Sequence, residues 1–118
     1  MNRTTTTFAA AFALLLAQNS IACEQPAAIS IPDGSNATVE EMNTAGDAFH
    51  RYMTDMQIYQ TCIENEANTE RMKAEDLGKT ELKQQEDKYA ALHNSASDEM
   101  AQAAKAFDEA VKVFKARQ

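Results

Sequence analysis

Apolar residues recur at alternating intervals of three and four positions through the middle of the chain. This spacing places them on one side of a helix and is typical of a seam between two helices. Thr38 and Glu41 precede the run and match a capping box, in which each side chain bonds the backbone of the other residue. We therefore expect a first helix over about residues 38–77, with these seam positions: Met42, Ala45, Phe49, Tyr52, Met56, Tyr59 and Ile63.

A second run with the same spacing follows a short break at Leu77-Gly78-Lys79-Thr80. Gly78 is expected to end the first helix and Thr80 to cap the next, because glycine favours helix C-termini and threonine favours N-caps. The run predicts a second helix over about residues 80–117. Its seam positions are Leu82, Tyr89, His93, Ala96, Met100, Ala103, Phe107, Ala110 and Phe114.

Two helices of similar length joined by a short turn fold back antiparallel, so facing residue numbers here sum to about 157. The expected fold class is all-α, a coiled-coil-like antiparallel hairpin. Its predicted pairs include Met42 with Phe114, Phe49 with Phe107, Met56 with Met100, and Ile63 with Ala96. The predicted core comprises Met42, Phe49, Tyr52, Met56, Tyr59, Ile63, Tyr89, Met100, Phe107 and Phe114.

A hairpin of this kind buries only one stripe of each helix. It therefore needs a covalent staple or a partner to supply the missing contacts. Dimerisation to a four-helix bundle is one arrangement that would supply them, because it buries a second side of each helix. The partner expected from sequence is thus another protein or a second copy of the chain.

The first 22 residues have the layout of a secretory signal peptide. Arg3 provides a positive charge, Phe8 to Ala17 form an apolar run, and the small residues Ser20 and Ala22 precede Cys23. The run is about ten residues long, which is too short to span a bilayer. We expect cleavage between Ala22 and Cys23 and a periplasmic or secreted mature protein with no membrane span.

Residues 23–37, which we call the arm, are expected to be extended. Pro26 and Pro32 disfavour helical geometry in the residues before them, and Pro32-Asp33-Gly34 indicates a turn. Ile29 and Ile31 point the same way in an extended segment, since side chains alternate. They are expected to pack on a strip of the first helix formed by Ala48, Tyr52 and Ile58.

The mature chain retains two cysteines, Cys23 and Cys62. In an oxidising compartment, two cysteines most simply form one disulfide. Such a bond requires the arm to run back along the first helix, because Cys62 lies about 35 Å from the helix start. The alternative is an outer-membrane lipoprotein anchored through Cys23, although Ser20 departs from the aliphatic residue usual three positions before a lipidated cysteine.

Charge narrows the classes of partner. The chain of 118 residues has 11 basic and 18 acidic side chains, a net charge of −7. Removal of Arg3 with the signal peptide leaves 10 basic against 18 acidic residues, a net charge of −8. An acidic protein is repelled by nucleic acid and by anionic membrane surfaces. Neither is expected as a partner.

No cluster of side chains typical of catalysis or metal binding is found in the sequence. His50 and His93 are predicted to lie about 25 Å or more apart, with His93 facing Asn65 and Glu66. Met53 and Met56 match a copper-binding spacing, but both are better explained as core residues. We expect no enzyme, no cofactor and no catalytic or metal residue; a periplasmic metal or haem carrier is the alternative.

Residues at the turn, at both cysteines and along the helices match a family pattern: Cys23, Pro32-Asp33-Gly34, Glu41-Met42, Tyr59, Cys62, His93-Asn94, Asp98-Glu99-Met100, Phe107 and Phe114-Lys115-Ala116. In these positions the chain resembles a family of short exported proteobacterial proteins of unknown function. The resemblance implies an address in the bacterial envelope, and the family offers no established activity or catalytic residue to carry over. The sequence as a whole predicts an exported, non-catalytic protein-interaction module.

Overall fold

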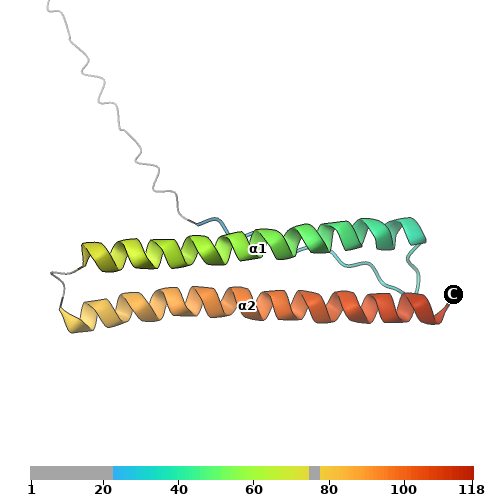
Figure 1. The fold of residues 1–118 in the computed structure, drawn as a ribbon. Helices are drawn as coiled ribbons and strands as arrows, with labels where there is room; N and C mark the ends of the chain where they lie inside the picture. Colours follow the sequence, from blue (N-terminus) through green and yellow to red (C-terminus); the bar gives the residue numbers. More distant parts are fainter. Residues whose placement is uncertain (1–22, 75–77) are drawn as a thin grey trace, which may run out of the picture.

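The computed structural model of the protein describes residues 23–74 and 78–118. Two antiparallel helices lie side by side, α1 over Val39–Lys73 and α2 over Lys79–Ala116 (Figure 1). Within these residues no strand is present. The predicted all-α hairpin is therefore confirmed. The proposed signal peptide and its cleavage site before Cys23 involve residues that lie outside this description.

The capping box at the start of α1 is present in full. The backbone N–H of Glu41 donates to Oγ1 of Thr38 at 3.1 Å, and the backbone N–H of Thr38 donates to Oε2 of Glu41 at 2.7 Å. The backbone N–H of Thr38, together with the Thr38 hydroxyl at 3.0 Å from the same oxygen, stabilises the charged carboxylate and holds the pKa of Glu41 below its ordinary value. The two backbone bonds of the box also satisfy donors that have no partner inside the helix.

The helix ends facing each other across the hairpin turn differ from the prediction. The first helix ends at Lys73 with Ala74 as its C-cap, earlier than the predicted end at residue 77. The second helix begins after Gly78, which is its N-cap and makes no side-chain cap bond. Gly78 thus starts α2 instead of ending α1, and Thr80 lies inside the helix. The seam pattern is weakest before this turn, so few apolar contacts prolong α1.

The core consists of two clusters at different heights along the hairpin. Tyr52, Met56, Tyr59, Ile63 and Ala96 form the larger cluster, with Tyr89, Leu92, Met100 and Ala103 packed against it. Ala37, Met42 and Ala110 form the smaller one, with Ile31, Val111 and Phe114 around it. Burial raises the pKa of the Tyr52 phenol, and the nearby Glu99 carboxylate adds to this shift.

The predicted seam residues are not equally buried. Met42, Tyr52, Met56, Tyr59 and Ile63 on α1 are buried, and Met56 is completely enclosed. Phe49, Tyr89, Met100, Phe107 and Phe114 are only half-buried, which differs from their assignment to the core. The reason is geometric. The arm covers the seam between the two helices on one long face of the hairpin, and the opposite face of the seam remains open to solvent.

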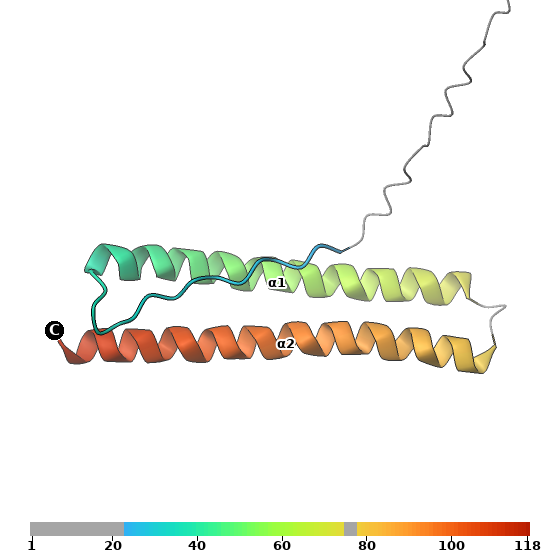
Figure 2. The ribbon, with the colours of Figure 1, turned by 180° about the vertical axis from the view of Figure 1, so that it is seen from behind.

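The arm lies against both helices (Figure 2). It begins at Cys23 beside α1, crosses to the C-terminal end of α2, and returns to the start of α1. Ile29 packs on the larger cluster, as expected near Tyr52, whereas Ile31 packs on the smaller cluster with Met42 and Ala110. Ile58 is 62% exposed, so its predicted contact with the arm is wrong. The crossing to α2 moves Ile31 off the predicted strip.

A disulfide joins the start of the arm to the middle of α1. The Cys23 and Cys62 sulfurs are bonded, and their Cα atoms lie 5.7 Å apart. Next to this bond, the Gln25 amide donates to Oε2 of Glu99 on α2 at 2.7 Å. The predicted disulfide is confirmed, and the arm is held to both helices near its first residues.

The far end of the arm is a compact turn built on Asp33. The backbone carbonyl of Asp33 accepts from the N–H groups of Asn36 and Ala37 at 3.1 and 2.9 Å. Its carboxylate accepts from the backbone N–H and the hydroxyl of Ser35 at 2.9 and 2.8 Å. These bonds hold the pKa of Asp33 below its ordinary value. The turn is therefore held by hydrogen bonds among its own residues, in addition to its contacts with α2.

Gly34 and Arg117 dock this turn on the last turns of α2. A Cβ on Gly34 would overlap the backbone carbonyl oxygen of Ala110 and lie 2.9 Å from the backbone nitrogen of Phe114. Arg117 Nε donates to the Gly34 carbonyl at 2.8 Å, and its Nη2 donates to the Ala37 carbonyl. The Arg117 guanidinium also lies 4.9 Å from the centre of the Phe114 ring. The backbone conformation of Gly34 is ordinary, so glycine is needed here for space.

Gly34 in the turn and Gly46 in α1 make a matched test, because a Cβ on either residue would face α2. Gly34→Ala is expected to lower the free energy of unfolding by about 1–3 kcal/mol, because the new methyl group must displace backbone. Gly46→Ala is expected to raise it by about 0.5–1 kcal/mol, since alanine favours helix. A Cβ at Gly46 would lie 3.7 Å from Cζ of Phe107, an ordinary contact.

Urea unfolding followed by circular dichroism measures both changes. Equal effects from the two substitutions would contradict the docking of the turn on α2, because both introduce the same methyl group. A stabilising Gly34→Ala would contradict it as well.

Candidate interaction surface

The two long faces of the hairpin differ because the arm covers only one of them. Figure 1 looks onto the other, with the arm behind the helices. We call this the open face and define it by eight residues that line it at helical spacing: Gly46, Phe49, Met53 and Gln60 on α1, and Ser97, Met100, Ala104 and Phe107 on α2. Ala48 and Glu99 lie next to the arm. Helical periodicity of about 100° per residue places the eight residues on the opposite side of the hairpin.

The Phe49 and Phe107 rings form the apolar part of the open face. They stack with centroids 4.7 Å apart and planes 10° apart, and both are half-buried. Next to them is a hollow of about 570 Å³ lined by both helices, including Gly46, Val111 and Phe114. The predicted pairing of Phe49 with Phe107 is thus observed, with one side of the pair facing solvent.

Gln60 links the two helices in the middle of this face. Its Nε2 donates to Oγ of Ser97 at 2.7 Å and to the backbone carbonyl of His93 at 3.3 Å. The Ser97 hydroxyl in turn donates to the same carbonyl at 3.2 Å. These neutral hydrogen bonds hold the helices in register without a charged group.

The end of this side toward the hairpin turn is polar. His93 Nε2 lies 3.2 Å from Oε1 of Glu64, and Arg71 Nε lies 3.5 Å from Oε1 of Glu86. The sequence predicted that His93 faces Asn65 and Glu66, so the carboxylate that it meets differs from the prediction by one to two residues. The numbers of His93 and Glu64 sum to 157, as the predicted register of facing residues requires. Asn65 and Glu66 lie further round α1.

Charged side chains are absent from the middle of the open face. Between positions 49 and 61 of α1 the charged residues are Arg51 and Asp55, and both line a hollow beside Ile29 of the arm. In α2, between positions 96 and 107, Glu99 bonds the arm, whereas Asp98 and Lys105 lie about 160–180° from the buried Ala96. The open face is therefore uncharged over a length of about 18 Å.

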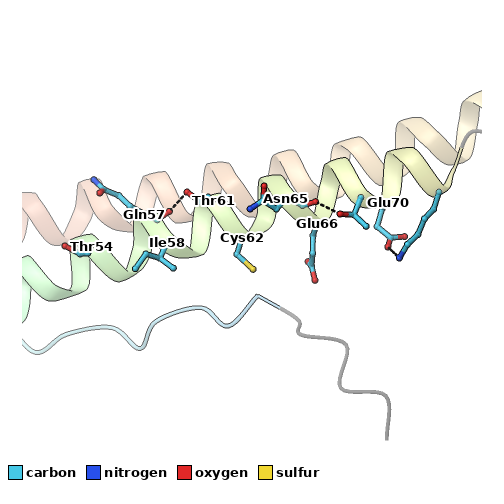
Figure 3. A pocket seen from close by; sticks show the side chains of 10 residues that line it. Thr54, Gln57, Ile58, Thr61, Cys62, Asn65, Glu66 and Glu70 are labelled. Carbon is cyan, nitrogen blue, oxygen red and sulfur yellow. Dashed lines mark hydrogen bonds and ion pairs between the residues drawn. The ribbon is translucent and has the colours of Figure 1, made fainter. Parts of the chain in front are cut away.

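A wide hollow against α1 is not a closed site. It has a volume of about 680 Å³ and lies on the outer side of α1 beside Cys62 (Figure 3). All of its lining residues belong to α1, so it has a single wall. Figure 3 shows Ile58 and Glu66 at its rim, with the Cys62 sulfur turned toward the arm. A surface of one helix does not bring reactive groups together from several directions.

The candidate metal ligands considered from the sequence are separated. Met56 is completely enclosed, while His50 is exposed and His93 is beside Glu64. In residues 23–74 and 78–118 no group of three histidine, cysteine or acidic residues has a metal-binding arrangement. Neither α1 nor α2 is both long and apolar enough to cross a membrane. The candidate site in the described residues is therefore an exposed surface of the hairpin.

Comparison with known proteins finds no matching family model, no matching curated protein and no matching solved structure.

Proposed function

We propose that this protein is an exported, non-catalytic interaction module that binds another protein chain through its open face. The observation that carries the proposal is the unequal covering of the two long faces. The arm, the disulfide and Arg117 close one of them, whereas Phe49 and Phe107 remain half-exposed on the other. Long helix pairs with a half-exposed apolar stripe are suited to recognition of helices.

Export is supported by the cysteine chemistry together with the signal-like N-terminus. Disulfides persist in oxidising compartments such as the bacterial periplasm. The Cys23 sulfur is bonded to Cys62, and a sulfur in a disulfide does not carry a thioether-linked lipid. This favours a protein without a lipid anchor over the lipoprotein alternative, with an address in the bacterial envelope as the family resemblance implies.

Intact-mass measurement of the protein purified from the periplasm tests the address and the disulfide together. The expected mass is that of residues 23–118 lacking two hydrogens. A mass that includes residues 1–22, or that includes a lipid, contradicts this part of the proposal.

Site-specific photocrosslinking in cells tests the binding surface. A photoreactive phenylalanine analogue at Ala104 of the open face is expected to give a discrete crosslinked product. The matched control is the same analogue at Ala91, which is exposed and lies about 140° around α2 from the buried Ala96. Equal crosslinking from both positions would show that the open face is not the binding surface.

A further inference from the structure

We infer that the partner on the open face is a second copy of this chain, so that the two hairpins form a four-helix bundle. The inference rests on the proposed use of the open face and specifies its occupant. Three features of the described residues support a second copy: the distribution of charge, the incomplete burial of α2, and the height of the aromatic pair.

The first feature is charge. With 10 basic against 18 acidic residues, the mature chain repels a copy of itself over most orientations. The repulsion is smallest where the contacting surfaces carry no charge, and the open face is uncharged around Met53, Gln60 and Met100. A basic partner would instead be attracted to the acidic stretches at residues 64–70 and 81–87. The neutral open face is thus the surface on which two acidic copies can approach.

The second feature is the incomplete burial of α2. Of its 38 residues only Ala96 and Ala110 are buried, although its seam includes large apolar side chains. Tyr89, Met100 and Phe107 remain half-buried because the hairpin has no third layer on this side. A second hairpin placed face to face would supply that layer, as in a four-helix bundle.

The third feature is that the aromatic pair suits a symmetric contact. Phe49 and Phe107 stack at the same height on the two helices. A two-fold axis parallel to the helices leaves this height unchanged, so the pairs of the two copies would meet in one layer of four rings. An interface of this type uses the same patch on both copies.

Sedimentation equilibrium of the oxidised protein tests the inference. The wild-type protein is expected to have twice the mass of one mature chain. Ala104→Glu places a charge at the contact twice, once from each copy, and is expected to weaken the dimer at least about tenfold. Ala91→Glu, the same change on the outer side of α2, is expected to leave the dimer intact. Circular dichroism checks that both variants keep their helices.

Gln57→Glu provides a second variant that preserves side-chain shape. Gln57 is exposed and borders the open face, and its side chain makes no hydrogen bond within the described chain, so folding should be unaffected. It is also expected to weaken the dimer. Wild-type protein that stays monomeric at its highest soluble concentration would overturn the inference, as would a dimer that neither Ala104→Glu nor Gln57→Glu weakens.

The two proposals fail in different ways. A monomeric protein that still crosslinks from Ala104 to a different chain would overturn the second copy and leave the open face as the binding surface. Absence of any crosslink from Ala104, together with a monomeric protein, would overturn both.

Discussion

Reduction of the Cys23–Cys62 disulfide is expected to lower the free energy of unfolding by about 4 kcal/mol. The two cysteines are 39 positions apart, so the bond removes a large loop from the ensemble of unfolded conformations. The same bond holds the arm against the larger core cluster, where Cys23 and Ile29 pack. For a domain of this size, a loss of 4 kcal/mol corresponds to a fall in melting temperature of roughly 15–30 °C.

Thermal unfolding with and without a thiol reductant measures this effect. The double variant Cys23→Ser with Cys62→Ser serves as the control, because it should melt like the reduced protein and be insensitive to reductant. Each single variant should do the same. Equal melting temperatures for oxidised and reduced wild-type protein would show that the arm contributes no stability through this bond.

Met56→Ala is expected to destabilise the protein by about 3 kcal/mol, within the range of 2–5 kcal/mol observed for such truncations. Met56 is completely enclosed in the larger cluster, between Tyr52, Tyr59 and residues of α2. Its removal leaves a cavity that the surrounding helices cannot fully close. Helix propensity does not offset the loss, since methionine and alanine are both good helix formers.

Met72→Ala is the matched control on the same helix, since Met72 is 76% exposed. It is expected to change the free energy of unfolding by no more than about 0.5 kcal/mol. Urea unfolding of both variants in the oxidised state gives the comparison. Similar effects at the two positions would contradict the placement of Met56 in the core.

The local features of this fold could be predicted from sequence because they depend on residues close together in the chain. The capping box requires only Thr38 and Glu41, and the seam follows from intervals of three and four positions. The disulfide was predictable because the sequence contains only two cysteines. The ends of the helices at the hairpin turn were less predictable, since the apolar pattern weakens before Gly78 and propensity alone does not set a boundary.

The course of the arm could not be predicted in the same way. Sequence reasoning placed Ile31 and Ile58 together on α1, whereas the arm crosses to α2 and leaves Ile58 exposed. The roles of Gly34 and Arg117 were missed. Pro32-Asp33-Gly34 indicated only a turn, and an arginine at a helix C-terminus needs no explanation beyond the helix dipole. Their contact joins residues 83 positions apart, and no periodic pattern encodes it.

For the candidate surface, too, the sequence determined some features and the tertiary structure decided others. The sequence by itself determined that two amphipathic helices would pair, that Phe49 would meet Phe107, and that Cys23 could reach Cys62, because each follows from helical geometry and chain length. Only the tertiary structure decided which face the arm covers and which face remains open. That choice depends on close approach between the irregular turn at Gly34 and the backbone of Ala110, a fit that appears only when distant segments are in place.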